Sequence, residues 1–218
     1  MDIGKCIYRV SYGLFFVILR LFFRLEIKGK ENIPQNGPAI LVANHFSLLD
    51  PFVVTCCTNR IIHWLVASWV FRIKPFSFFA KRVPFLKVEP RKGNNKEALK
   101  QATNLLSQNR IIGVFPEGQL SRSGELNPFL SGAAYIGIKS KVPIIPLYID
   151  GAYKAFRRDN NFLKWPKICV KIGENFSLNE VYNPAYKDDI EKGSEFIKDR
   201  IAGLKKEVEN ELYRRNRN

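Results

Sequence analysis

One segment of the sequence holds a pair of residues suited to general-base catalysis: His45 and Asp50, within Asn44-His45-Phe46-Ser47-Leu48-Leu49-Asp50. A turn between them can bring the carboxylate onto the imidazole, where it would fix the histidine tautomer and stabilise the imidazolium that forms on proton uptake. Such a base needs no serine or cysteine nucleophile when the hydroxyl of the substrate attacks directly. The residues leave one alternative open, in which Asp50 only caps a helix that begins near Pro51.

A second polar segment, Phe115-Pro116-Glu117-Gly118, also follows an apolar run. If the two preceding strands are parallel, Glu117 emerges at the same edge of the sheet as His45, and the two segments share one crevice. Glu117 can then accept hydrogen bonds from a polyol acceptor, although an exposed turn carboxylate fits the pattern equally. Gly118 allows the backbone to approach a ligand closely, or it is a plain turn glycine.

Two arginines are candidates for binding a phosphate group. Arg91 and Arg122 each follow shortly after a predicted strand, and a guanidinium matches the paired oxygens of a phosphate. The chain has 35 lysines and arginines against 20 acidic residues, a net charge of +15. This excess predicts an anionic partner, which composition alone leaves open as nucleic acid, an anionic bilayer or a phosphorylated substrate.

Histidines and cysteines are too few or wrongly spaced for most metal centres. His45 and His63 are the two histidines, so a centre with several histidines is nearly excluded, and a site on His45 and Asp50 would lack its third and fourth ligands. The four cysteines show no CxxC spacing and indicate a reducing, cytoplasmic setting. The sequence therefore implies no metal and no cofactor.

The elements that must position these residues alternate between strands and helices. Apolar runs predict strands at residues 38–43, 61–67, 85–89, 111–115, 143–149 and 168–172, and helical patterns occupy 48–58, 95–108, 131–140 and about 188–215. This alternation predicts one α/β domain with a largely parallel mixed sheet flanked by helices. In the last helix, an apolar stripe should dock on the domain; it consists of Ile197, Ile201, Leu204, Val208 and Leu212.

The amino-terminal residues 1–24 predict an amphipathic helix lying in a membrane interface, with residues 25–218 forming the α/β domain. The uncharged run 10–19 is half the roughly 20 residues that a spanning helix needs. On a helical projection, basic residues share one face (Lys5, Arg9, Arg20 and Arg24), and apolar residues occupy the other (Ile7, Val10, Leu14, Val17, Ile18, Leu21 and Leu25). The alternative is an ordinary amphipathic helix packed on its own domain.

A basic, aromatic stretch lies between Arg72 and Lys92. Seven cations accompany one acid, Glu89, with six aromatic residues between positions 69 and 85. Aromatic residues among cations can stack nucleobases, but they also suit a surface that inserts into lipid headgroups. The amino-terminal helix favours an anionic membrane surface over nucleic acid, although a solvated face over core phenylalanines remains open.

Taken in order, these motifs resemble those of the 1-acyl-sn-glycerol-3-phosphate acyltransferase (lysophosphatidate acyltransferase) family. The NHxxxxD motif of that family corresponds to Asn44 through Asp50. The second block corresponds to Val88-Glu89-Pro90-Arg91, the third to Phe115-Pro116-Glu117-Gly118 with Ser121-Arg122-Ser123-Gly124, and the fourth to Val142-Pro143-Ile144-Ile145-Pro146. Together the blocks cover roughly residues 25–150, which is far more specific than any one of them.

The resemblance implies transfer of a fatty acyl group from acyl-CoA or an acyl carrier protein to the free hydroxyl of a membrane lysophospholipid, giving phosphatidate from 1-acyl-sn-glycerol-3-phosphate. His45 would be the general base and Asp50 would hold it. The substrate-binding residues would be Asn44, Arg91, Glu117, Gly118 and Arg122. The implied location is the cytoplasmic face of the cell membrane, as a peripheral or monotopic protein with no nucleic-acid partner.

The third block departs from the family pattern at Leu120. Many members read EGTRS where this chain reads Glu117-Gly118-Gln119-Leu120-Ser121, so an arginine commonly credited with phosphate binding is absent. Two alternatives follow: an acyltransferase for another lysolipid or an acyl-amino-acid acceptor, and a non-catalytic basic membrane-surface protein. The presence of both His45 and Asp50 favours an enzyme over a non-catalytic protein.

Overall fold

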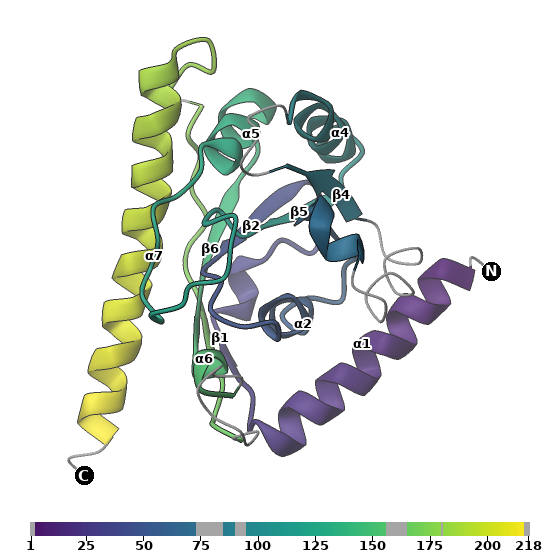
Figure 1. Ribbon diagram of the computed structural model, residues 1–218, viewed down its shortest axis with the longest axis vertical. Coiled ribbons are helices and arrows are strands. Elements are labelled where there is room, and N and C mark those ends of the chain that lie inside the picture. Colours follow the sequence, from purple (N-terminus) through teal and green to yellow (C-terminus); the bar gives the residue numbers. More distant parts are fainter. Residues whose placement is uncertain (1–2, 73–84, 90–94, 156–164, 180, 216–218) are drawn as a thin grey trace.

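The computed structural model describes residues 3–72, 85–89, 95–155, 165–179 and 181–215. Among these residues, seven strands form one sheet in the order β1-β7-β6-β2-β5-β3-β4 (Figure 1). The strands are β1 (Glu26–Lys28), β2 (Ala39–Ala43), β3 (Ile62–Ala67), β4 (Phe85–Val88), β5 (Ile111–Val114), β6 (Ile144–Asp150) and β7 (Cys169–Ile172). The helices are α1 (Ile3–Phe22), α2 (Asp50–Thr55), α4 (Lys96–Ser107), α5 (Gly132–Ser140), α6 (Ala152–Ala155) and α7 (Lys187–Arg215), with 3-10 turns at Lys30–Asn32 and Ser68–Arg72.

The sheet is largely parallel. Strands β6, β2, β5, β3 and β4 are parallel to one another, whereas β7 pairs with β6 in the antiparallel sense and with β1 in the parallel sense. The predicted α/β fold with a largely parallel mixed sheet is therefore confirmed. The pairing also brings the carboxyl ends of β2 and β5, and the polar segments that follow them, to the same edge of the sheet.

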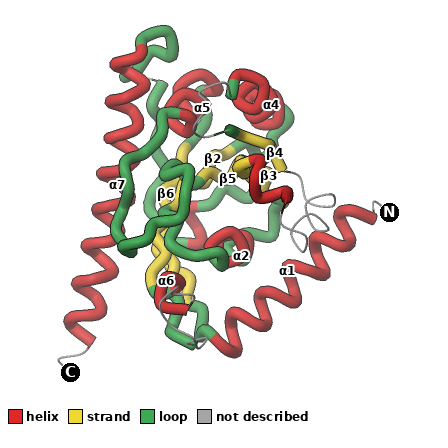
Figure 2. The backbone as a smooth tube through the Cα atoms, viewed as in Figure 1, coloured by secondary structure: helices red, strands yellow, loops and turns green. Residues whose placement is uncertain are grey.

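Two apolar layers bury the sheet from both sides. Leu41 of β2 belongs to the layer that includes Val53 and Val54 of α2, with α1 and α6 on the same face. The adjacent Ile40 and Val42 belong to the opposite layer, which is covered by α4, α5 and α7 (Figure 2). All five residues of β2 are buried. Burial on both faces is the reason that the central strands are continuous apolar runs rather than alternating ones.

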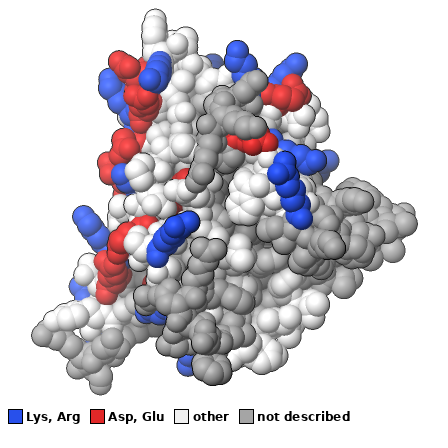
Figure 3. Space-filling view, viewed as in Figure 1, with Lys and Arg blue, Asp and Glu red and all other residues white. Residues whose placement is uncertain are grey.

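Helix α7 docks on the domain as predicted, except at its end, and it packs on the same face of the sheet as α5, over β6 and β7. Four residues of the predicted stripe are buried, namely Ile197, Ile201, Leu204 and Val208. Leu212 is 38% exposed, so the prediction that it belongs to the docked stripe is wrong. Ion pairs replace apolar contact there: Glu211 pairs with Lys28 of β1 and with Lys171 of β7. Figure 3 shows acidic and basic side chains interspersed along this helix.

Apart from shifts of one residue at element ends, the observed elements differ from the predicted ones in three places. The helix expected at 48–58 is confined to Asp50–Thr55 in α2, and β1 and α6 have no predicted counterpart. Strand β1 reads Glu-Ile-Lys at the edge of the sheet, so it lacks the apolar run of four or more residues by which strands are predicted. Helix α6 has only four residues, which is too short for a helical repeat to show.

Helix α1 has two apolar faces with different surroundings. On one face Phe15 stacks on Phe52 of α2, with ring centroids 4.2 Å apart, and Leu19 is buried in the core. The other face exposes Leu14, Val17 and Leu21, which are 59%, 51% and 69% exposed. The core layer includes Phe23 and Leu25, which lie on either side of the predicted division after residue 24. No helix in the described part of the chain combines the length and apolarity needed to cross a membrane.

Candidate active site

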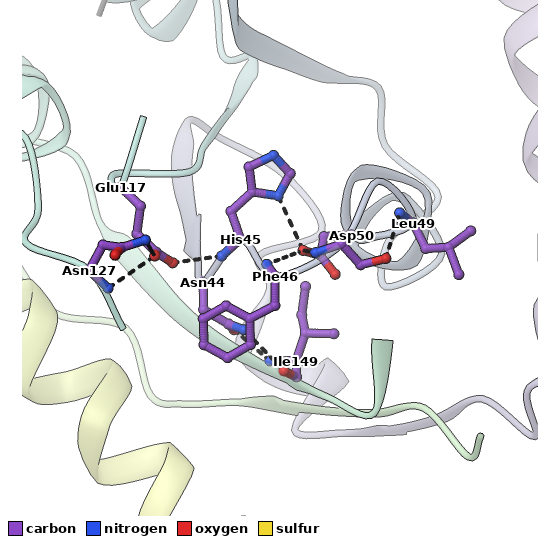
Figure 4. A network of polar contacts seen from close by, with 9 residues as sticks. Asn44, His45, Phe46, Leu49, Asp50, Glu117, Asn127 and Ile149 are labelled. Atoms are coloured by element: carbon purple, nitrogen blue, oxygen red, sulfur yellow. Dashed lines mark hydrogen bonds and ion pairs between the residues drawn. The ribbon is translucent and has the colours of Figure 1, made fainter. Parts of the chain in front are cut away.

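The loop between β2 and α2 brings His45 and Asp50 together, as predicted. Nδ1 of His45 lies 3.1 Å from Oδ2 of Asp50; the Asp50 side chain is fully buried, and that of His45 is 17% exposed. The second ring nitrogen, Nε2, points away from Asp50 (Figure 4). Since an ionised carboxylate only accepts hydrogen bonds, Nδ1 carries the proton in the neutral ring and Nε2 keeps a free lone pair. The arrangement is that of a general base with its orienting carboxylate.

Asp50 organises the loop before it rather than capping the helix after it. The backbone N–H groups of Phe46 and Ser47 both donate to Oδ2 at 2.7 Å. The N-cap of α2 is Leu49, which makes no side-chain capping bond. The capping alternative is therefore wrong. Burial raises the pKa of Asp50 above its usual value. The hydrogen bonds from His45, Ser47 and Phe46 oppose this rise by favouring the ionised form.

Glu117 lies at the same rim as His45, as predicted, and its side chain accepts a hydrogen bond from the backbone of His45. The N–H of His45 donates to Oε1 of Glu117 at 2.8 Å, and the N–H of Ser121 donates to the carbonyl of His45 at 2.8 Å. The other oxygen, Oε2, accepts from the backbone N–H and the side-chain amide of Asn127, at 3.0 and 2.8 Å. Sequence reasoning missed Asn127, because an asparagine ten residues after a glutamate has no distinguishing pattern.

These contacts make Glu117 a buried positioning residue. Its side chain has both carboxylate oxygens hydrogen-bonded within the protein, and only 4% of the residue is exposed. Burial raises its pKa, opposed by the hydrogen bonds from His45 and Asn127. Direct contact of Glu117 with the acceptor stays a prediction.

Asn44 is also fully buried and connects the loop between β2 and α2 to the neighbouring strand β6. Its Oδ1 accepts from the N–H of Ile149 at 2.7 Å, and its Nδ2 donates to the carbonyl of Ile149 at 3.0 Å (Figure 4). The substrate contact predicted for Asn44 stays a prediction, because in the structure its side-chain amide bonds to the backbone of Ile149.

The remaining predicted substrate-binding residues have different positions. Gly118 has a φ of 65°, a left-handed conformation that favours glycine, in the turn closed by its N–H to the carbonyl of Phe115. Arg122 is exposed, and its backbone carbonyl accepts from the hydroxyl of Tyr153 at 2.8 Å. Arg91 lies outside the described residues. Arg122 follows Glu117 by five residues and is thus the described one of the two arginines predicted to bind phosphate.

The thiols of Cys56 and Cys57 are unsuited to nucleophilic attack. Both are fully buried, and burial raises the pKa of Cys56 to about 12 and that of Cys57 further. Because a thiolate is the reactive form, neither can attack at neutral pH. Among the described residues, no three His, Cys, Asp or Glu side chains gather in a way that could hold a metal ion.

Comparison with known proteins places this geometry in a family. The model of the family described as Acyltransferase matches residues 24–150. The chain is 26% identical over 208 residues to the 1-acyl-sn-glycerol-3-phosphate acyltransferase of Bacillus subtilis, covering 94% of this chain and 98% of that protein. It is 29% identical over 137 residues to a chloroplastic 1-acyl-sn-glycerol-3-phosphate acyltransferase of Brassica napus, where the match spans 61% of this chain and 39% of the relative.

A solved structure has the same fold. The crystal structure of the 1-acyl-sn-glycerophosphate (LPA) acyltransferase PlsC from Thermotoga maritima superposes with a TM-score of 0.69, at 21% identity, covering 94% of this chain and 84% of that one. The family match includes β2, the loop that contains His45 and Asp50, β5 and the segment that contains Glu117. The chain therefore belongs to the acyltransferase family.

Proposed function

We propose that this protein transfers a fatty acyl group from an acyl thioester to the free hydroxyl of 1-acyl-sn-glycerol-3-phosphate, giving phosphatidate. The observation that carries the proposal is the His45–Asp50 pair at the carboxyl edge of the sheet, with Nε2 of His45 directed away from its carboxylate. The family model matches the segment that contains the pair, and relatives named for this activity match 94% and 61% of the chain.

The geometry supports a direct transfer with His45 as the base. The hydroxyl oxygen of the acceptor attacks the thioester carbonyl carbon while its proton passes to Nε2 of His45. The carbon–sulfur bond then breaks, and the imidazolium returns the proton to the leaving thiolate. Asp50, fully buried beside Nδ1, stabilises the imidazolium between these two steps.

The donor is a thioester of coenzyme A or of an acyl carrier protein, and the scheme needs no other cofactor. The test is a thioester-consumption assay on the purified full-length protein with both donors and a panel of lysolipid acceptors. Formation of phosphatidate from lysophosphatidate supports the proposal. Absence of acyl transfer to every lysolipid in the panel contradicts it.

A second acceptor class is favoured by the residue at position 120. Leu120 stands where many family members have an arginine, and its half-buried side chain offers no charge to a phosphate. A lysophospholipid with a larger headgroup, or an acyl-amino-acid lipid, carries less charge than a phosphomonoester and has less need of that arginine. These acceptors belong in the same assay panel.

The phosphate-binding role of Arg122 leads to a prediction. If lysophosphatidate is the acceptor, Arg122→Ala should lower kcat/KM for it by about 10- to 100-fold, because a charge-assisted hydrogen bond to phosphate is lost. The KM for the donor should change little, and Leu120→Arg should improve use of lysophosphatidate relative to lysophosphatidylethanolamine. An Arg122→Ala enzyme with an unchanged preference for lysophosphatidate would exclude the phosphate contact.

We further propose that the exposed face of α1 attaches the protein to the cytoplasmic face of a membrane as a peripheral or monotopic protein. Leu14, Val17 and Leu21 form an exposed apolar stripe, and Trp165, which is 47% exposed, packs against Phe22 at the end of the same helix. Amphipathic helices with aromatic residues at one end lie in membrane interfaces, and the net charge of +15 adds attraction to anionic lipid.

This attachment predicts the behaviour of a surface variant. Replacing Leu14, Val17 and Leu21 together with glutamine should weaken binding to vesicles of phosphatidylcholine and phosphatidylglycerol by roughly 10- to 100-fold, because three partly inserted apolar side chains are lost. The control variant replaces Val181 and Leu212, two exposed apolar residues outside the exposed face of α1, with glutamine. It should bind the vesicles as the wild type does. Unchanged sedimentation of the triple variant at high salt would show that α1 is not the anchor.

A further inference from the structure

Three aromatic rings stack in a row behind the active site, beginning with His45. The imidazole lies 4.1 Å from the ring of Phe115, centroid to centroid, with 14° between the two planes. Phe115 in turn lies 4.9 Å from Trp64, with 8° between their planes. Trp64 belongs to β3 and Phe115 follows β5, so the row crosses two adjacent parallel strands.

The far end of this stack is held rigidly by the sheet. Trp64 is 3% exposed and pairs in register with Gly113 of β5. A Cβ added at Gly113 would lie 2.6 Å from the indole ring, a distance that real side chains do not reach. The indole therefore lies across the bare backbone of Gly113, and Phe115 is held between the indole and the imidazole.

The stack restrains His45 where its hydrogen bond does not. The bond from Nδ1 to Asp50 fixes one edge of the imidazole, but it leaves the ring free to swing about that contact. A parallel ring against one face fixes the plane, and the electron-rich face of an aromatic ring also attracts a cation. In the proposed reaction the imidazole becomes that cation.

We propose that Phe115, supported by Trp64 and Gly113, is a positioning residue that fixes the plane of the His45 ring and stabilises the imidazolium formed during acyl transfer. This inference rests on the proposed function, because it assigns the stack a task in that reaction. Phe115 also packs against the core, so the experiment must separate stacking from the filling of space. Leucine at position 115 keeps an apolar side chain and removes the aromatic face.

The kinetic test compares Phe115→Leu with Phe115→Tyr in the full-length protein. We expect Phe115→Leu to lower kcat by about 3- to 30-fold, the range of a cation–π contact that is partly or fully desolvated. The KM values for donor and acceptor should be unchanged, and Phe115→Tyr, which restores a stacked ring, should recover most of the rate. If Phe115→Leu does not fold, Phe115→Met, which is unbranched and adaptable in packing, provides the same comparison.

A spectroscopic measurement tests the stack without substrate. With two histidines in the chain, a His63→Gln variant assigns the imidazole proton signals, and the ring current of Phe115 should place those of His45 upfield. They should move downfield in Phe115→Leu and stay upfield in Phe115→Tyr. Unmoved His45 signals, or a Phe115→Leu enzyme with wild-type kcat, would overturn the inference. A wild-type protein that shows the upfield signals but transfers no acyl group would instead contradict the proposed function.

Discussion

Replacing His45 with alanine is expected to lower kcat by about 10² to 10⁴, the usual contribution of a positioned general base. The loss follows from the geometry, because Nε2 of His45 faces away from Asp50, while the thiols of Cys56 and Cys57 are buried. The backbone contacts of His45 with Glu117 and Ser121 do not involve the imidazole. The variant should therefore fold and bind acceptor nearly as the wild type does.

The control for this variant is His63→Gln, which changes the other histidine of the chain. His63 lies within β3, and burial lowers the pKa of its imidazole, as expected for a partly buried ring. Its replacement should leave kcat nearly unchanged. An active His45→Ala enzyme, or detection of a covalent acyl group on any residue of the wild type, would contradict the direct mechanism.

Asp50→Asn is expected to lower kcat by about 10² to 10⁴ as well, with a distinct physical cause. Oδ2 accepts from Nδ1 of His45 and from the N–H groups of Phe46 and Ser47. Asparagine matches the shape but has one acceptor oxygen and no charge, so it can orient the wrong tautomer and cannot stabilise the imidazolium. The measurement is kcat under saturating donor and acceptor, with thermal unfolding recorded for the same preparation.

Glu117→Gln is the matched comparison, because it neutralises the second buried carboxylate of the site. Glu117 contacts the backbone of His45 rather than its ring, so the expected loss in kcat is smaller, on the order of tenfold. Equal losses in the two variants would show that Asp50 supports the loop and not the charge on the imidazole. A folded Asp50→Asn enzyme with wild-type turnover would remove Asp50 from the mechanism.

Local patterns predicted most of the central elements, for a reason visible in β2. All five residues from Ala39 to Ala43 are buried, so the apolar run itself marks the strand. The prediction of elements and of docking residues failed where side chains are only partly buried or where charged side chains make the contacts. Strand β1 has two charged residues out of three, and the end of α7 docks through Glu211 while Leu212 stays exposed.

In the candidate active site, contacts between residues close in sequence could be predicted more directly than contacts between residues far apart in sequence. His45 and Asp50 are close in sequence, so one turn brings them together and their residue types were enough to predict the pair. Glu117 could be assigned to the same rim only by assuming that its strand is parallel to β2, which the pairing of β2 with β5 confirms.

Asn127, Phe115 and Trp64 owe their roles to the tertiary structure. Strand β3 follows β2 in the chain, yet β5 lies between them in the sheet, and only that order places Trp64 behind Phe115 and both rings behind His45. The strand order minimises the free energy of the whole domain, since helices must cover both faces of the sheet at once. The sequence around Phe115 or Trp64 does not reveal this strand order, so the stacking of Trp64 on Phe115 and of Phe115 on His45 follows from the folded domain alone.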